Sequence, residues 1–263
     1  MPTFRTRDDC ILHYRIHGNG TSGPVLVFIN GTGQTTYNWI PLARRLSSRF
    51  RVILYDCRGQ GNSGSGRWPL HLDTHAQDLA ALMGHLGVGR AGIVGLSHGA
   101  RIAMAAAGRL GRQIYGMVVM SVGLKTGARA QAAIRSWRHV LDSGGMPAMA
   151  WAMVPHVFGE AFLCDHRALL PKVVDALVQR NDSYQMANML DAQMRYDPSN
   201  RLPTPRAFPI LVVVGEEDLL VTPENARQLA EAVNGRWVCL NRVGHSIPAE
   251  APDQLLELID DFF

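Results

Sequence analysis

The chain has 263 residues, of which 47% are hydrophobic and 18% charged, and its formal net charge is +4. This composition supports a sizeable buried core and excludes an intrinsically disordered chain. Because the basic residues form no stripe or block, nucleic acid is not an expected partner.

Short apolar segments alternate with amphipathic helical segments in the first part of the chain. Residues 10–18 are predicted to form the second strand of an N-terminal hairpin. The almost continuously apolar residues 25–31 indicate a parallel strand covered on both faces, and the helix after it has Pro41 in its first turn. The next expected elements are a strand over 51–56, a helix with Leu79, Leu82, Met83 and Leu86 on one face, and strands over 91–95 and 115–123.

Residues 125–207 interrupt this alternation, because they contain no clear strand and are predicted to form several helices. Breaks are expected at residues 143–145, at Pro155 and at Pro171, and the proline-rich residues 196–209 are expected to form a stiff connection back to the sheet.

The alternation resumes at the C-terminal end of the chain. Strands are predicted over 208–215 and 236–240, each followed by a helix. Strands that alternate with helices indicate an α/β fold, in which a mostly parallel central sheet has helices on both faces. In this prediction residues 1–124 and 208–263 form the core, and residues 125–207 form an inserted helical cap, or lid.

A serine lies between two glycines where an expected strand meets an expected helix. Residues 95–99 read Gly-Leu-Ser-His-Gly, which is the G-x-S-x-G pattern of a nucleophile elbow. The sharp turn would lift the Ser97 hydroxyl clear of the sheet, and Gly95 and Gly99 would leave room for close packing. The pentapeptide alone occurs by chance in about one chain in ten of this composition, so the prediction depends on its place between strand and helix.

A serine nucleophile needs a base, and the base needs an orienting acid. In a nucleophile-elbow fold the chain order is serine, acid, histidine. Asp218 follows one expected strand near the C-terminus and His245 follows the next, at the strand ends where open α/β sheets place their sites. Each alone could be an ordinary loop residue. With Ser97 they form a candidate catalytic triad, in which Glu216 and Glu217 are alternative acids.

Acyl chemistry also needs hydrogen-bond donors for the oxyanion that develops on the substrate. The backbone N–H of His98, at the start of the helix after the elbow, is one candidate donor. The second is expected from the loop over residues 30–33, and we predict that it is the N–H of Thr32.

Four motifs together resemble the α/β-hydrolase superfamily: residues 95–99, 56–63, 215–218 and 244–245. The resemblance implies the α/β-hydrolase fold with a helical cap, no cofactor and a covalent acyl-enzyme. It implies that Ser97 is the nucleophile, His245 the general base and acid, and Asp218 the orienting carboxylate. Asp56 and Arg58 match a segment of this family that is usually structural.

One position departs from the common family pattern. Many members have histidine where this chain has Asn30, and an asparagine there is similar to enol-lactone hydrolases. The stretch Ile29-Asn30-Gly31, followed by Thr35 and Thr36, is also similar to the 3-hydroxyacyl acyltransferases of bacterial glycolipid synthesis. Both ester or lactone hydrolysis and acyl transfer from a thioester carrier therefore stay open.

The expected cap is rich in methionine and aromatic side chains, which are adaptable and apolar. Each of them could simply pack the cap against the core. Because a cap must roof the site, we expect some to line an apolar acyl pocket. The candidates are Trp151, Met153, Phe158, Phe162 and Met186.

The four cysteines are scattered without a C-x-x-C pair, which favours free thiols in a reducing compartment over disulfides or a zinc site. The first ten residues lack the apolar stretch of a signal peptide, and no run approaches 18 apolar residues. We therefore expect a cytoplasmic protein that has no metal site and binds no membrane.

The leading prediction is a serine hydrolase that cleaves a small apolar carboxylic ester or lactone without a cofactor. The alternative enzyme is an acyltransferase or thioesterase that acts on carrier-bound acyl thioesters and would have an acyl carrier protein as its partner. A third hypothesis is a ligand-binding protein on the same scaffold without turnover. The oligomeric state has no signal in the sequence.

Overall fold

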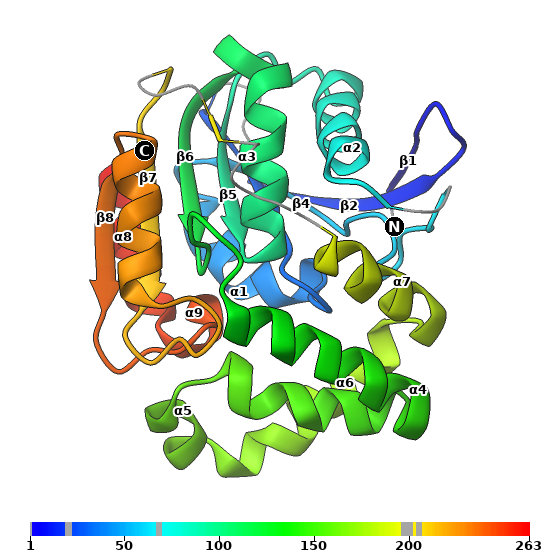
Figure 1. Ribbon diagram of the computed structural model, residues 1–263. Helices are drawn as coiled ribbons and strands as arrows, with labels where there is room; N and C mark the ends of the chain where they lie inside the picture. Colours follow the sequence, from blue (N-terminus) through cyan, green and yellow to red (C-terminus); the bar gives the residue numbers. More distant parts are fainter. Residues whose placement is uncertain (1, 19–22, 67–69, 196–201, 204–206) are drawn as a thin grey trace.

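The computed structural model describes the chain except residues 1, 19–22, 67–69, 196–201 and 204–206. Its centre is an eight-stranded sheet in the order β1-β2-β4-β3-β5-β6-β7-β8 (Figure 1). β2 pairs antiparallel with both of its neighbours, and the pairs from β4 to β8 are parallel. The strands are Thr3–Arg5 (β1), Ile11–His17 (β2), Val25–Ile29 (β3), Arg51–Tyr55 (β4), Ala91–Leu96 (β5), Ile114–Met120 (β6), Ile210–Gly215 (β7) and Arg236–Leu240 (β8).

Helices cover both faces of this sheet, so the predicted α/β-hydrolase architecture is confirmed. One layer contains Leu72–His85 (α2), His98–Leu110 (α3) and Pro223–Ala232 (α8), and the other contains Thr36–Leu46 (α1), the short Ile247–Glu250 (α9) and Pro252–Phe262 (α10). Pro41 lies in the second turn of α1 rather than the first, because the helix begins at Thr36 and not nearer to the proline.

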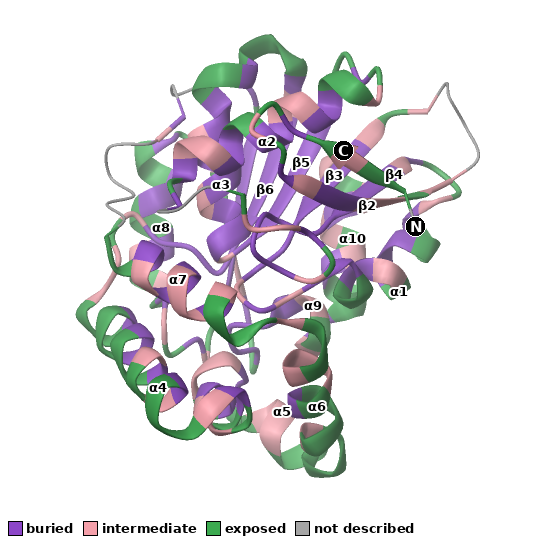
Figure 2. Ribbon diagram, turned by 90° about the vertical axis from the view of Figure 1, so that its right-hand side faces the viewer, coloured by how far each residue is buried: buried purple, intermediate pink, exposed green. Residues whose placement is uncertain are grey.

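Alternate residues of each central strand face opposite helical layers. In β3, Val27 and Ile29 belong to the core cluster on the side of α2, α3 and α8, whereas Leu26 and Phe28 belong to the cluster on the side of α1 and α10. Both faces of the strand are therefore shielded from solvent. This explains why its sequence is continuously apolar and does not alternate between apolar and polar residues. Figure 2 shows the buried strands between partly exposed helices.

Between β6 and β7 lies a helical segment, residues 128–194, at the end of the sheet where the parallel strands terminate (Figure 1). Its helices are Ala128–Val157 (α4), Glu160–Asp165 (α5), Leu170–Arg180 (α6) and Ser183–Met194 (α7). One of the three expected breaks needs correction. α4 is kinked at Gly145, where φ is +71°, but it continues through Pro155. Pro171 lies in the first turn of α6, which begins at Leu170, so a helix boundary does occur there.

Most of the proline-rich connection over 196–209 lies outside the described residues. None of the helices in the described part of the chain has the length and apolar character needed to cross a membrane. The four cysteines are free thiols.

Candidate active site

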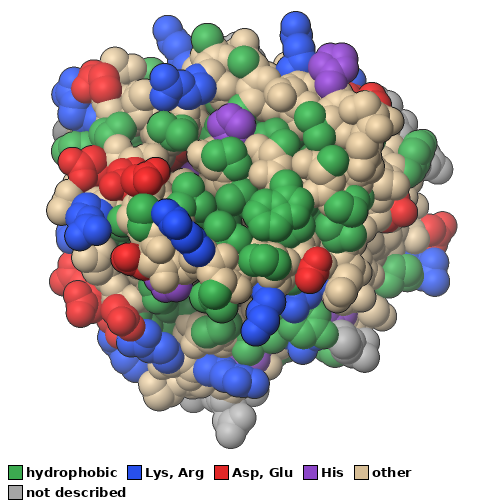
Figure 3. Space-filling model, turned by 90° about the horizontal axis from the view of Figure 1, so that it is seen from below, with side chains coloured by type: hydrophobic (Ala, Val, Ile, Leu, Met, Phe, Trp, Pro, Cys, Tyr) green, Lys and Arg blue, Asp and Glu red, His purple; other side chains and the backbone are tan. Residues whose placement is uncertain are grey.

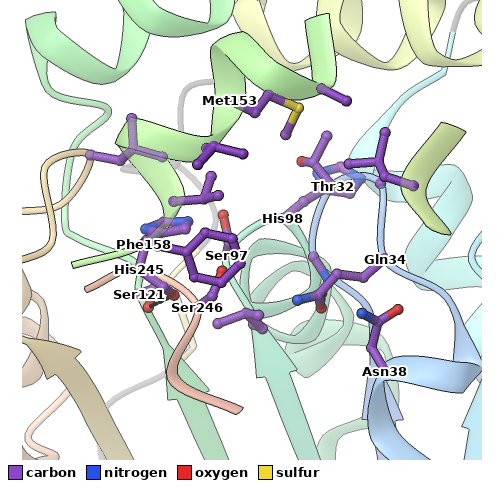
Figure 4. A pocket seen from close by; sticks show the side chains of 18 of the residues that line it. Thr32, Gln34, Asn38, Ser97, His98, Ser121, Met153, Phe158, His245 and Ser246 are labelled. Carbon is purple, nitrogen blue, oxygen red and sulfur yellow. Dashed lines mark hydrogen bonds between the residues drawn. The ribbon is translucent and has the colours of Figure 1, made fainter. Parts of the chain in front are cut away.

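Ser97 occupies a sharp turn between β5 and α3. Its φ of +52° lies in a backbone region that residues other than glycine rarely adopt. The strained residue is held because its N–H donates to the Met120 carbonyl at 2.8 Å and its carbonyl accepts from the Arg101 N–H at 3.1 Å. The turn places the Ser97 side chain at a cavity above the sheet (Figure 4).

The two glycines of the elbow are required by close backbone packing. A Cβ atom on Gly95 would lie 2.6 Å from the Gly99 carbonyl oxygen, and one on Gly99 would lie 2.2 Å from the Ile29 carbonyl oxygen. Both distances are too short for any side chain. The expectation that Gly95 and Gly99 leave room for close packing is therefore confirmed.

Replacing Gly99 by alanine is expected to lower the free energy of unfolding by at least about 1–3 kcal/mol, because the new methyl group overpacks against backbone. Urea unfolding measures this loss. Gly108→Ala in the same helix is the matched control, since nothing lies within 4 Å of its added Cβ. That variant should gain about 0.5–1 kcal/mol from better helix propensity. Equal effects at the two positions would contradict the packing explanation.

His245 and Asp218 are paired at the same cavity. His245 Nδ1 lies 2.8 Å from Asp218 Oδ2, and both side chains are buried. The other carboxylate oxygen of Asp218 accepts hydrogen bonds from the backbone N–H groups of Leu220 and Val221, at 2.8 and 2.9 Å. The fixed carboxylate places the proton of the imidazole on Nδ1 and leaves Nε2 as a base. Ser97, His245 and Asp218, predicted from chain order, are thus brought together.

The alternative acids bind elsewhere. Glu216 accepts from the Arg242 N–H at 3.1 Å, and Glu217 accepts from the Ala161 N–H at 3.2 Å. Asp218 is therefore the carboxylate of this loop that is hydrogen-bonded to His245.

Two further residues, which the sequence analysis missed, hold the loop that carries His245 in place. Ser121, at the end of β6, donates its hydroxyl to the His245 carbonyl at 2.7 Å. Glu250 accepts from the N–H groups of Gly159, Gly244 and Ser246 at 2.7–2.9 Å, and burial raises its pKa. A single serine or glutamate outside a motif carries no signal of such contacts in the sequence.

The loop after β3 is anchored by Asn30, which is fully buried. Its amide nitrogen donates to the Tyr55 carbonyl at 3.0 Å, and its amide oxygen accepts from Trp39 Nε1 at 2.8 Å. Both halves of the amide are used, so this asparagine ties the loop after β3 to the end of β4 and to α1. Thr32 in the same loop and His98 of the elbow both line the cavity, on the side of Ser97 away from His245 (Figure 4).

The cavity has a volume of about 370 Å³ and lies between the sheet and the helical segment. Met153 and Phe158 line it, as predicted. Trp151, Phe162 and Met186 do not, which corrects the expectation for these three. Trp151 is on the outer face of α4, 46% exposed, Phe162 stacks on Phe158 with 4.6 Å between ring centres, and Met186 is buried in the core of the helical segment.

His98 of the elbow and His75 of α2 are both buried, with their ring centres 5.2 Å apart. Burial lowers the pKa of His75 from 6.5 to about 3 and lowers the pKa of His98 well below 6.5. Both rings are therefore neutral in the folded chain at neutral pH. Unfolding at mildly acidic pH takes up protons, so the two rings couple stability to pH.

We expect the wild type to lose stability as the pH falls below 6.5, by about 1.4 kcal/mol per pH unit for each buried neutral histidine. The stabilisation is complete above 6.5, because there neither state binds the proton, and it is lost towards pH 3. In His75→Phe, the free energy of unfolding should change less steeply with pH between 6 and 4, by about 1.4 kcal/mol per pH unit. Urea unfolding at a series of pH values measures this slope. His139→Phe, at an exposed position, is the control. Equal slopes in wild type and His75→Phe would contradict the assignment.

Asp56 and Arg58, taken as structural in the sequence analysis, do not line the cavity. Asp56 lies 3.1 Å from His13 Nδ1 and accepts from the Thr36 N–H at 2.6 Å. Arg58 is buried between Asp8 and Asp78. In the described residues no cluster of three or more His, Cys, Asp or Glu side chains could hold a metal ion.

A model described as the alpha/beta hydrolase family matches residues 26–258, so the chain belongs to this family. It is 25% identical over 257 residues to the "Putative carbamate hydrolase RutD" of Agrobacterium fabrum, covering 92% of this chain and 94% of the relative. It is 26% identical over 257 residues to 3-oxoadipate enol-lactonase 2 of Acinetobacter baylyi, covering 96% and 94%.

Among solved structures, the enol-lactonase from Burkholderia xenovorans matches with a TM-score of 0.86 and 28% identity, over 99% of each chain. An α/β hydrolase from a Medee basin deep-sea metagenome library matches with a TM-score of 0.91 and 26% identity, over 100% of this chain and 97% of the other. The protein is thus an enzyme of the α/β hydrolase class, and the hypothesis of a scaffold without turnover is set aside.

Proposed function

We propose that the protein hydrolyses a small apolar carboxylic ester or lactone through an acyl-enzyme. The observation that carries this proposal is the buried His245–Asp218 pair at 2.8 Å, facing the cavity into which the strained Ser97 points. The nucleophile, the base and the orienting acid come from three separate strand ends, in the arrangement that acyl transfer requires.

In the first half of the reaction the Ser97 Oγ atom attacks the carbonyl carbon, and its proton passes to His245 Nε2. Asp218 stabilises the imidazolium through the bond to Nδ1. The N–H groups of Thr32 and His98 stabilise the oxyanion of the tetrahedral intermediate. The bond to the leaving oxygen then breaks, and that oxygen takes the proton from His245.

In the second half a water molecule loses a proton to His245 and attacks the acyl-enzyme. The acid product leaves when Ser97 regains its proton. With a lactone, the leaving oxygen stays tethered to the acyl group, so a single hydroxy acid is released.

The comparisons support a carbonyl substrate of this kind. One relative is named for carbamate hydrolysis and two for enol-lactone hydrolysis. In both substrate classes a carbonyl carbon bears a heteroatom leaving group. We propose that the helical segment, residues 128–194 of the expected cap, roofs the acyl site, because Met153, Val154 and Phe158 of its α4 end line the cavity together with Ser97.

A chain-length series of 4-nitrophenyl esters, extended by a lactone and a carbamate, tests the proposal. We expect an optimum at short or medium acyl chains, because a cavity of about 370 Å³ holds a small ligand. Ser97→Ala should lower kcat by about 10⁶-fold. Ser246→Ala, which removes another hydroxyl from the same cavity, is the matched control and should cost less than about 10-fold. Turnover that survives in Ser97→Ala would overturn the proposal.

The second candidate function is acyl transfer or thioester cleavage with a carrier-bound substrate. The observation in its favour is the mouth of the cavity, where Lys172 and Arg180 are exposed and no described lining residue is acidic. Figure 3 shows hydrophobic side chains gathered on the face of the molecule seen from below, with basic and acidic side chains around them. A carrier-bound acyl thioester that turns over far faster than every simple ester would favour this function.

A further inference from the structure

The helical segment contacts the loop that carries Thr32 through two side-chain amides. Gln193, near the end of α7, donates from Nε2 to the Thr32 Oγ1 atom at 2.7 Å. Asn181, between α6 and α7, donates from Nδ2 to the Gly33 carbonyl at 2.9 Å. Gln193 is buried and lines the cavity, as Thr32 does.

The direction of the Gln193 bond decides what the Thr32 hydroxyl can do. An amide nitrogen only donates, so Oγ1 is the acceptor and its own proton must point elsewhere. In the part of the chain that the structure describes, the Thr32 hydroxyl accepts this bond and donates none to another protein group. Figure 4 shows the Thr32 side chain at the cavity wall, facing the space above Ser97.

We propose that the Thr32 hydroxyl is a third donor to the substrate oxyanion, and that Gln193 orients it. This inference rests on the proposed acyl chemistry at Ser97. The carbonyl oxygen becomes an alkoxide in the tetrahedral intermediate, so a hydroxyl donor aimed at it contributes more in the transition state than in the bound substrate. Thr32 is then a catalytic residue, whereas Gln193 is a positioning residue that acts through it.

Thr32→Val keeps the shape of the side chain and the backbone N–H but removes the donor. It should lower kcat for the best ester by about 10²- to 10³-fold with little change in KM, because one oxyanion donor is lost. Thr32→Ser, which keeps the hydroxyl, should recover most of this loss. The affinity for an alkylboronic acid, which forms a tetrahedral adduct with a serine, should fall with kcat in Thr32→Val.

The role of Gln193 is tested by a double-mutant cycle with Gln193→Leu and Thr32→Val. If Gln193 acts through the hydroxyl, Gln193→Leu lowers kcat in the wild-type background and has almost no further effect in Thr32→Val. Asn181→Ala is the matched control, because it removes a contact between the same two regions without touching the hydroxyl. Its effect should be the same in both backgrounds.

Two results would overturn the inference. One is a Thr32→Val enzyme with wild-type kcat and wild-type boronic acid affinity. The other is a Gln193→Leu loss of equal size in both backgrounds, which would mean that Gln193 only anchors the helical segment. Both results require an active wild type and an inactive Ser97→Ala variant as references. If the proposed function itself were wrong, the wild type would hydrolyse no substrate, so the two failures can be told apart.

Discussion

Asp218→Asn is expected to lower kcat for ester hydrolysis by about 10⁴-fold while leaving KM and the fold almost unchanged. The asparagine Oδ1 can still accept from the N–H groups of Leu220 and Val221. Its amide nitrogen, however, would donate to His245 Nδ1 and move the imidazole proton to Nε2. In that tautomer His245 cannot take the proton from Ser97. Steady-state kinetics on the best ester measures the loss.

The matched control is Glu217→Gln, one position away in the same loop. Glu217 accepts from the Ala161 N–H rather than from the histidine, so this variant should cost less than about 10-fold. If Glu217→Gln were the inactive variant and Asp218→Asn the active one, the assignment of the orienting acid would be wrong.

Removing the cation of Arg58 is expected to cause a large loss of stability. Its guanidinium makes bidentate contacts with Asp78 at 2.7 and 2.8 Å and also contacts Asp8 at 2.6 and 2.9 Å, with only 1% of the arginine exposed. Arg58→Met leaves the buried Asp78 carboxylate without a counter-charge. We expect the free energy of unfolding at pH 7 to fall by about 3–5 kcal/mol in urea titrations.

Two further measurements on Arg58→Met, its pH dependence and a second substitution, separate the effect of the lost charge from the effect of the lost packing. Burial already raises the pKa of Asp78, and loss of the arginine should raise it further. A carboxyl group whose pKa is higher in the folded than in the unfolded chain makes the protein less stable as the pH rises through the folded pKa. The stability deficit of Arg58→Met relative to wild type should therefore shrink as the pH falls from 7 towards 5. Arg58→Met with Asp78→Leu should be more stable than Arg58→Met alone. A less stable double variant would show that the lost packing of the arginine dominates.

The fold was predictable because its signals are local. Strands such as β3 and β7 are buried on both faces and therefore stand out as apolar runs, and the helices between them repeat apolar residues at helical spacing. Ser97, Asp218 and His245 were predictable because they follow β5, β7 and β8 in a fixed chain order. Ser97 directly follows β5, and the other two lie in the loops just after β7 and β8. The start of α1 was misjudged because a proline signals a first turn even where tertiary packing extends the helix.

The pocket and the supporting contacts were not predictable, because they depend on which faces of distant segments meet. Met153 lines the cavity while Trp151, two residues earlier, points to solvent, and composition does not distinguish them. The bond from Gln193 to Thr32 joins residues far apart in the sequence, as does the bond from Ser121 to His245. Neither pair has a motif.

Labelling with diethyl 4-nitrophenyl phosphate tests the central claim most directly. Attack by Ser97 Oγ would form a bond to phosphorus and release 4-nitrophenolate. We expect stoichiometric release, a diethylphosphoryl group on the peptide that contains Ser97 in the mass spectrum, and complete loss of ester hydrolysis, with no labelling of Ser97→Ala. An unlabelled wild type that still hydrolyses esters, or a label on Ser121 or Ser246 of the same cavity, would contradict a covalent mechanism at Ser97.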